Sequence, residues 1–276
     1  MPPERYAVGI DLGGSKLRGG LLSDAGQLVA RLELQTEAWK GPAGVLANLK
    51  GLITRLLDST DRSRIAGIGI AAAGQIHPKT HAVVYAPNLE WHDVPLRAEI
   101  ESLFELPTYV ENDVRAAAWG EYRFGVGRGA QSLIAVFVGT GVGSGAVVDG
   151  ILLRGFNNAA GVPTSLAEET GHDASRLTGA LVARAAAAGD AFAREVWSDA
   201  ERHLGTALAG YVTLLNPERL ILGGGIMSKV PALFDTLARR VHAQATVMAR
   251  EVRVQRAGLA DSAGIFGAAD RVWTRV

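Results

Sequence analysis

The first residues that could do chemistry are an acid and two glycines at the end of an apolar run. Asp11 follows Val8-Gly9-Ile10, and Leu12 separates it from Gly13-Gly14-Ser15-Lys16. Glycine lets a backbone approach a ligand closely, and bare N–H groups beside a carboxylate suit a metal–phosphate complex. A P-loop is disfavoured, because Ser-Lys stands where Lys-Ser/Thr is required and strands are expected to follow. The stretch predicts a phosphate site between two strands, or a plain turn with an incidental acid.

A second glycine-rich turn follows the apolar run Leu133–Val138. Its sequence is Gly139-Thr140-Gly141-Val142-Gly143-Ser144-Gly145, and hairpin signals come after it. A dinucleotide fingerprint needs a helix at that point, so a Rossmann site is disfavoured. The order of strand, glycine turn, strand, Asp/Gly turn and strand echoes the beginning of the chain. The sequence therefore suggests an internal duplication. A third glycine cluster, Gly223-Gly224-Gly225, follows another short apolar strand.

Asp113 stands where a predicted strand meets a predicted helix. Either Asn112 or Asp113 could cap that helix. Ligands of α/β sheets gather at the carboxyl ends of strands, where a carboxylate could accept a proton from a substrate hydroxyl. The helix N-terminus is expected to lower the pKa of Asp113. A weak base still serves in phosphoryl transfer, where positioning and charge stabilisation carry most of the catalysis.

Composition bounds the class of protein. The chain has 276 residues, 48% of them hydrophobic, and its 28 basic residues balance 28 acidic ones. A net charge of zero argues against a nucleic-acid partner. The absence of cysteine excludes disulfides and thiolate zinc sites. Neither a leader sequence nor an apolar run long enough for a bilayer is apparent, so we expect a soluble cytoplasmic protein without a membrane partner.

Strand and helix patterns alternate along the chain, which predicts an α/β architecture. Gly41-Pro42 is expected to break the chain before a helix with its apolar stripe over residues 45–57, and residues 86–96 to form a loop leading into a helix. The remaining expected elements are strands at 65–70, 106–110, 133–138 and 219–222, helices at 114–124, 174–188 and 191–215, and a final helix, strand and helix.

Taken in order, the motifs resemble the ROK family of sugar kinases and repressors, within the actin/hexokinase-like superfamily. Each motif is weak alone, but the ordered set spans nearly the whole chain. The matching segments are Gly9–Lys16, Gly67–Gly74, Ala86–Leu96, Glu111-Asn112-Asp113, Val138–Gly145, Leu222–Gly225 and Gly258–Ala269.

The resemblance implies a two-lobed, ribonuclease-H-like ATPase fold with a cleft between the lobes. The lobes would be residues 1–116 with a C-terminal helix at about 262–276, and residues 117–261. Asp113 would be the general base, with Asn88 and Asn112 at the sugar. ATP would lie against the glycine turns, with Mg²⁺ held by Asp11, directly or through water. The expected nucleotide-binding residues are Asp11, Gly13, Gly14, Ser15, Lys16, Gly139, Thr140, Gly141, Gly223, Gly224 and Gly225. The family also implies a homodimer.

The sugar side departs from the family pattern of Gly-Glu-x-Gly-His followed by a cysteine-rich zinc loop. An ungapped alignment puts Val162 and Ser165 in place of the Glu and the His. A short insertion restores them as Glu169 and His172, and we prefer that alignment. No zinc site is expected under either alignment, because the chain has no cysteine.

These observations predict an ATP-dependent kinase for a hexose or N-acylhexosamine hydroxyl, with glucose as the default sugar. The alternative is a catalytically weak sugar- or nucleotide-binding protein descended from such kinases. The repressor reading loses support, since no helix-turn-helix extension is apparent and the net charge is zero. The sequence leaves open which sugar is used and whether ATP or polyphosphate is the donor.

Overall fold

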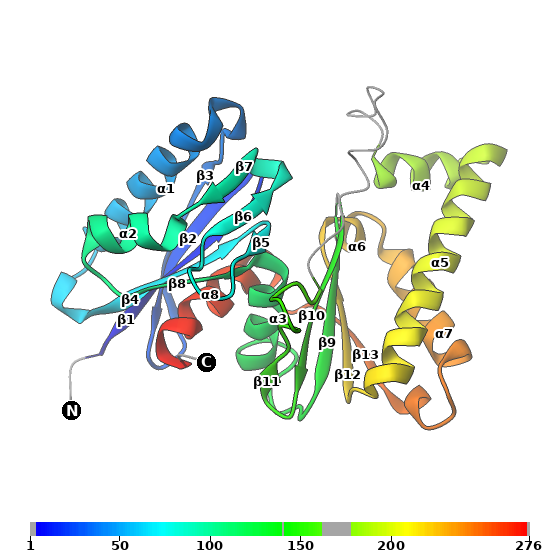
Figure 1. Ribbon diagram of the computed structural model, residues 1–276. Coiled ribbons are helices and arrows are strands. Elements are labelled where there is room, and N and C mark those ends of the chain that lie inside the picture. Colours follow the sequence, from blue (N-terminus) through cyan, green and yellow to red (C-terminus); the bar gives the residue numbers. More distant parts are fainter. Residues whose placement is uncertain (1–3, 140, 162–177, 275–276) are drawn as a thin grey trace.

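Two five-stranded mixed sheets with the same topology form the framework. A computed structural model describes residues 4–139, 141–161 and 178–274. In each sheet three antiparallel strands are followed by two parallel ones, in the orders β3-β2-β1-β4-β8 and β11-β10-β9-β12-β13 (Figure 1). This repeat confirms the duplication suggested by the glycine turns. The strands are β1 (Tyr6–Leu12), β2 (Lys16–Ser23), β3 (Leu28–Gln35), β4 (Ile65–Ala72), β8 (Thr108–Asn112), β9 (Leu133–Val138), β10 (Val142–Val148), β11 (Ile151–Leu152), β12 (Arg219–Gly223) and β13 (Arg253–Arg256).

A third, smaller sheet extends the first half. It consists of β5 (Gln75–Ile76), β6 (Val83–Ala86) and β7 (Trp91–Val94) in that order. The expectation of a loop over residues 86–96 was wrong, because that segment contains a 3₁₀ turn and then β7. Trp91 and Val94 are buried at the two ends of β7 while the two residues between them are exposed, so this four-residue strand lacks the strict apolar–polar alternation by which a strand is recognised.

Helix α1 (Gly41–Leu57) covers the outer face of the first sheet. Gly41 begins the helix, and Pro42 lies in its first turn. The predicted chain break was therefore wrong, because proline is well tolerated where the first N–H groups lack helical partners. The predicted apolar stripe is confirmed, since its seven residues are all buried. Burial of each Leu or Ile contributes about 1.5–3 kcal/mol. Helix α2 (Leu96–Phe104) follows β7.

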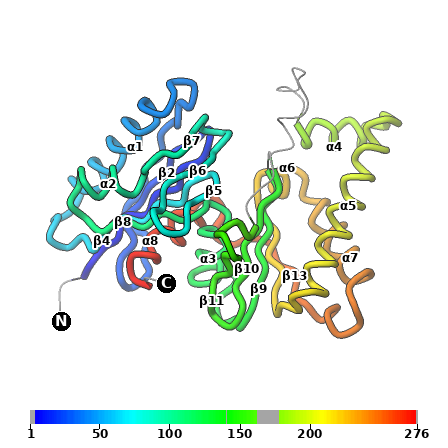
Figure 2. Tube along the Cα trace, viewed as in Figure 1, coloured from blue at the N-terminus to red at the C-terminus, as the bar shows by residue number. Residues whose placement is uncertain are grey.

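Two helices lie between the sheets, α3 (Asp113–Arg123) and α8 (Ala263–Thr274) (Figures 1 and 2). Each follows the last strand of one sheet and packs on the other sheet: α3 contacts β9 and β10, and α8 contacts β1 and β4. Glycines permit this crossing. A Cβ at Gly267 would lie 1.7 Å from the carbonyl oxygen of Ala116, and one at Gly69 would lie 1.8 Å from that of Ala268. The backbones touch, so these positions require glycine.

The outer face of the second sheet carries the remaining helices. Apolar side chains of α5 (Ala191–Leu215) and α7 (Pro231–Gln244) form one core with β9 and β12. Helix α4 (Gly179–Ala187) packs against α5, and α6 (Gly225–Lys229) follows β12. The helix expected over 174–188 is confirmed from Gly179 onward; residues 174–177 lie outside the described part.

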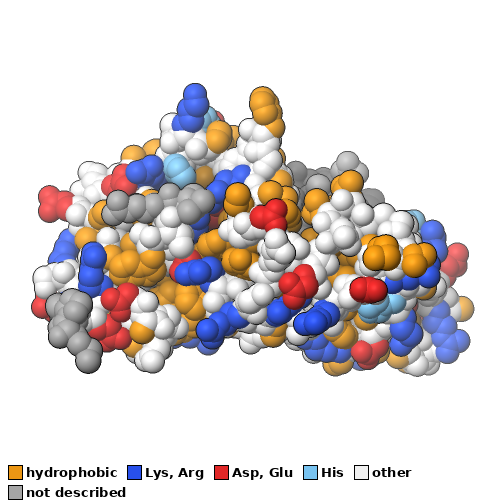
Figure 3. Space-filling view, turned by 90° about the horizontal axis from the view of Figure 1, so that it is seen from below, with side chains coloured by type: hydrophobic (Ala, Val, Ile, Leu, Met, Phe, Trp, Pro, Cys, Tyr) orange, Lys and Arg blue, Asp and Glu red, His pale blue; other side chains and the backbone are white. Residues whose placement is uncertain are grey.

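The surface mixes charges of both signs. On the face shown in Figure 3, acidic and basic side chains occur over both halves of the molecule. Among the described residues, no helix has the length and apolar character needed to cross a membrane.

Candidate active site

Two aspartates approach one another where the first sheet meets α3. Asp11 lies near the end of β1, and Asp113 is the first residue of α3. Burial and, after it, the charge of Asp113 raise the pKa of Asp11 to about 6, although Arg18 opposes both. The two carboxylates repel each other, so the pair favours a cation or a proton nearby.

Asp113 is not the cap of its helix. The Oδ1 of Asn112 accepts a hydrogen bond from the Arg115 N–H at 3.2 Å, which fills the cap position and leaves the Asp113 carboxylate to other partners. The sequence expectation of a lowered pKa was wrong. Burial raises the pKa of Asp113, and hydrogen bonds from the Val114 and Asp113 N–H groups only partly offset that effect. Desolvation outweighs the helix terminus here, which makes Asp113 a better base.

Asn112 orients the Asp113 carboxylate. Its Nδ2 donates to Oδ1 of Asp113 and to the carbonyl oxygen of Gly74, both at 3.0 Å. Asn112 is completely buried, so these contacts fix its side chain. Gly74 has φ 132°, and a Cβ there would meet the Tyr85 carbonyl oxygen at 2.5 Å. Glycine at position 74 therefore allows the close approach that holds Asn112 and the acid beside it.

The first glycine turn joins β1 to β2. The Gly13 N–H donates to the Lys16 carbonyl oxygen at 3.1 Å, and Thr36 Oγ1 donates to the Gly13 carbonyl oxygen at 2.6 Å. A Cβ at Gly14 would lie 2.8 Å from the Cβ of Asn88, so the predicted sugar-side residue packs against this turn. Ser15 and Lys16 are exposed, and the Lys16 ammonium forms an ion pair with Glu33 on the neighbouring strand β3.

The second and third glycine clusters come together in the other half. The Gly139 N–H donates to the Gly141 carbonyl oxygen at 2.8 Å, which closes the turn between β9 and β10. Gly224 has φ 96°, and a Cβ there would lie 2.4 Å from the Val138 carbonyl oxygen. A Cβ at Gly139 or Gly225 would meet no described atom within 4 Å. Backbone here is open to a ligand. Thr140 lies outside the described residues.

Arg18 is a site residue that the sequence reasoning missed. Its Nη1 lies 3.3 Å from Oδ2 of Asp11, its Nε 3.0 Å from Glu33, and its Nη2 3.4 Å from Asp261. Asp11 and Arg18 are directly opposed in the β1–β2 hairpin. The sequence contained a signal for this contact: the short turn at Gly13–Ser15 fixes the register of the hairpin, and that register pairs Asp11 with Arg18.

Glu111 belongs to the Glu111-Asn112-Asp113 motif, but its carboxylate is bound by arginines. Both of its carboxylate oxygens bind arginines: Oε1 lies 2.7 Å from Nη2 of Arg115, and Oε2 lies 2.9 Å from Nε of Arg154. These guanidinium groups hold the pKa of Glu111 below its usual range, although burial opposes them. Arg115 also donates to the Asn158 carbonyl oxygen at 2.7 Å, which ties α3 to the segment after β11.

Both predicted residues of the altered sugar segment lie outside the described residues. Glu169 and His172 fall in residues 162–177, as do Val162 and Ser165, so neither alignment is tested. The described chain reaches Gly161, whose carbonyl oxygen accepts a hydrogen bond from the Ser144 N–H at 2.8 Å. This contact holds Gly161 against β10.

The paired sheets, the crossed helices and the glycine turns are those of the actin/hexokinase-like superfamily. The chain belongs to the ROK family: the ROK family model matches residues 7–172 and 158–275. A glucokinase from Halalkalibacterium halodurans is 31% identical, over 96% of this chain and 94% of its own.

Solved structures agree with this assignment. A ROK family glucokinase from Streptomyces griseus, in complex with glucose and AMPPNP, has a TM-score of 0.77 at 27% identity and covers 96% of this chain and 98% of its own. A ROK hexokinase from Thermus thermophilus has a TM-score of 0.77 at 26% identity, over 96% of both chains. The fold is therefore the two-lobed fold of ROK sugar kinases, and the chain is a carbohydrate kinase.

Proposed function

We propose that this kinase transfers the γ-phosphoryl group of ATP to a hydroxyl of a hexose or an N-acylhexosamine, with Asp113 as the general base. The observation that carries the proposal is the setting of Asp113: it begins a helix beside Asp11, with its carboxylate oriented by Asn112 and its pKa raised by burial. The glucokinase relatives favour this function over a catalytically weak binding protein.

In the proposed reaction the sugar hydroxyl loses its proton to Asp113 and receives the γ-phosphoryl group of ATP. Asp113 accepts the proton of the sugar hydroxyl as the hydroxyl oxygen forms a bond to the γ-phosphorus, and the bond to the β–γ bridging oxygen breaks to release ADP. A raised pKa makes the carboxylate a stronger acceptor, and general base catalysis of this kind contributes about 10²–10⁴-fold. Asn112 would keep the acceptor oxygen in place and Asn88 would contact the sugar.

The nucleotide would lie across the two halves. Gly13, Gly14, Ser15 and Lys16 would face the phosphates from the first lobe, and Gly139, Thr140 and Gly141 from the second, with the nucleoside near Gly223, Gly224 and Gly225. The open space at Gly139 and Gly225 supports this placement, since neither position has a described neighbour where a Cβ would stand. Backbone N–H groups with no side chain above them suit phosphate oxygens.

A magnesium ion carried by ATP fits the acid pair. Asp11 would hold it directly or through water. Asp11 and Asp113 repel each other, and the single Arg18 contact to Asp11 is 3.3 Å long, so a nearby cation would relieve the repulsion. Mg²⁺ would supply neutralisation of phosphate charge during the transfer. We expect no zinc.

The sugar would be recognised by Asn88 and Asn112 together with Glu169 and His172. We take glucose as the first candidate because the similar proteins reported above are glucokinases.

The lobes would be residues 1–116 with about 262–276, and residues 117–261, which places the boundary within α3. We further propose a homodimer that works in the cytoplasm, where ATP and sugar substrates meet; light scattering on the purified chain tests the dimer.

A sugar panel tests the proposal. The purified chain is incubated with MgATP and glucose, mannose, N-acetylglucosamine or N-acetylmannosamine, and ³¹P NMR records any new phosphate monoester. We expect one hexose or hexosamine to be phosphorylated at a rate well above ATP hydrolysis in its absence. ATP binding without a monoester from any sugar would overturn the proposal. A parallel arm with polyphosphate identifies the donor.

A further inference from the structure

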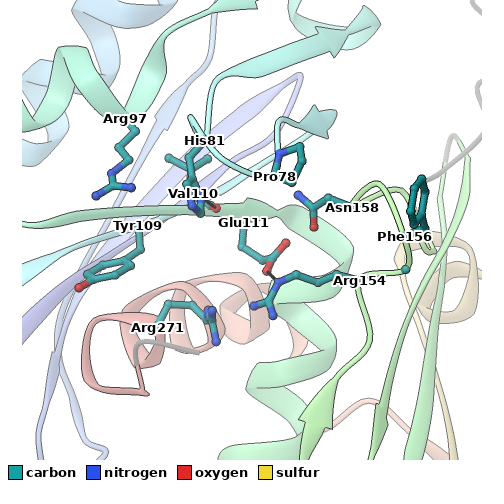
Figure 4. A pocket seen from close by; sticks show the side chains of 11 residues that line it. Pro78, His81, Arg97, Tyr109, Val110, Glu111, Arg154, Phe156, Asn158 and Arg271 are labelled. Atoms are coloured by element: carbon teal, nitrogen blue, oxygen red, sulfur yellow. Dashed lines mark hydrogen bonds and ion pairs between the residues drawn. The ribbon is translucent and has the colours of Figure 1, made fainter.

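A cavity of about 350 Å³ lies against the edge strand β8, beside the sheet rather than at the glycine turns. Its walls come from segments far apart in the sequence: the β5–β6 loop, α2, β8, the segment after β11, and α8 (Figure 4). The side chains that matter are polar or charged, and they are Arg97, Tyr109, Glu111, Arg154, Asn158 and Arg271. None of the described residues proposed for the sugar or the nucleotide belongs to this lining.

The charges around the cavity do not balance. Among the described residues, Glu111 is the one acidic member of the lining, and both of its oxygens are already bound to Arg115 and Arg154. Arg97 has its own partner, Glu101, at 3.1 Å. Arg271 remains as an additional cation on this wall. Figure 4 shows its guanidinium turned toward Glu111 and Arg154 from α8.

Arg271 is a buried cation that forms no ion pair with any of the described residues. The residue is only 8% exposed, and among the described residues its Nη1 has no hydrogen-bond partner. Burial, and after it the charge of Arg154, lowers the pKa of Arg271 to about 10, although Glu111, Asp270 and Tyr109 act in the other direction. A guanidinium in this setting costs free energy unless an anion pairs with it.

An unused acceptor faces the same space. Asn158 is 8% exposed; its Nδ2 donates to the Ile76 carbonyl oxygen at 2.7 Å, while its buried Oδ1 has no partner among the described residues. A ligand that satisfies both groups offers a negative oxygen to Arg271 and a hydrogen-bond donor to Asn158. A carboxylate group carries no donor of its own at neutral pH. Hydrogen phosphate carries both on one group, since it has negative oxygens and a P–O–H, and the phosphate of a monoester does so when singly protonated.

We propose that this cavity binds a phosphate oxyanion, either inorganic phosphate or a small phosphate monoester, with Arg271 as its main ligand. Arg154 is placed to add a second cationic contact, and the Asn158 amide oxygen accepts the hydroxyl. Guanidinium groups match phosphate by two parallel N–H donors. The proposal does not rest on phosphoryl transfer, because none of these side chains is assigned to the cleft.

Isothermal titration calorimetry without magnesium tests the site. The probes are sodium phosphate and glucose 6-phosphate, with sodium chloride at equal ionic strength as the blank. Wild type is compared with Arg271→Gln and with Arg253→Gln, a matched change of an exposed arginine on β13. We expect Arg271→Gln to lose one binding site or to weaken it by roughly tenfold or more, and Arg253→Gln to leave it unchanged. Tighter binding of the ester than of phosphate assigns the monoester as ligand; equal affinities assign inorganic phosphate.

Stability separates a ligand role from a structural one. Without phosphate, Arg271→Gln should unfold at the same temperature as wild type or higher, because it removes an unpaired buried charge. Phosphate should then raise the midpoint of wild type more than that of the variant. Equal affinity and stoichiometry in both proteins, or no binding to wild type, would overturn the proposal. If Arg271→Gln does not fold, Arg271→Lys is used, which keeps the charge, loses the two-pronged donor and should bind phosphate more weakly.

Discussion

At the residue scale, burial decides how the two acids of the cleft behave. Both Asp11 and Asp113 have raised pKa values, although an arginine and a helix N-terminus stand beside them. The sequence located both acids at strand ends, because apolar runs stop there. It could not give the sign of the Asp113 shift, since burial depends on helices that come later in the chain. Asn112 as the cap was one of the two predicted options.

Asp11→Asn should stabilise the ligand-free protein at neutral pH. The folded pKa of about 6 exceeds the ordinary aspartate value of 3.8, so ionised Asp11 lowers the free energy of unfolding above pH 6 and this penalty fades below pH 4. Asparagine carries no such penalty. Urea unfolding in EDTA should show a gain of at most about 3 kcal/mol at pH 8 that disappears near pH 4. The exposed Asp235→Asn serves as control, and a gain that is independent of pH would contradict the assignment.

At the element scale, glycines set how the helices meet. The helical stripe of α1 and the strands β1, β4, β9 and β12 were predictable, because their apolar patterns are long or uninterrupted. The β7 strand was not, since a four-residue strand behind Pro87 and Asn88 looks like a loop. The crossing of α3 and α8 was also beyond sequence reasoning. In the sequence Gly267 is an ordinary helix glycine, and its role is visible only once the opposing backbone at Ala116 is known.

Gly267→Ala should destabilise the protein strongly. The added Cβ would stand 1.7 Å from the Ala116 carbonyl oxygen, so α3 and α8 must separate, at a cost of about 3 kcal/mol. Gly51→Ala in α1 is the matched control, because a Cβ there meets nothing within 4 Å. That change should instead stabilise by about 0.5–1 kcal/mol, as helix propensity dictates. Chemical denaturation measures both, and equal effects would show that the crossing is not tightly packed.

At the scale of the whole molecule, two copies of one sheet topology are joined by helices that cross between them. The echo between the two glycine turns was enough to predict this repeat. The cavity beside β8 was not predictable, because Arg271 and Glu111 are 160 positions apart and only the fold of α8 brings them together. Sites made from single turns can be found in a sequence, whereas sites assembled from five segments require the structure.

Ligands bound to both halves should draw them together. The proposed nucleotide residues belong to both sheets, so a bound sugar and nucleotide would favour a closed arrangement that excludes water. Small-angle X-ray scattering with AMPPNP, Mg²⁺ and the accepted sugar should give a smaller radius of gyration than the free protein. An unchanged radius under saturating ligands would contradict closure.

The turnover of Asp113→Asn with the sugar that the panel identifies shows directly whether Asp113 is the general base. Asparagine keeps the size and the hydrogen bond to Asn112 but cannot accept the proton. We predict that kcat falls by about 10²–10⁴-fold while the Kd for the nucleotide stays within a few-fold of wild type. A variant that folds, binds the nucleotide and retains wild-type kcat would contradict Asp113 as the general base.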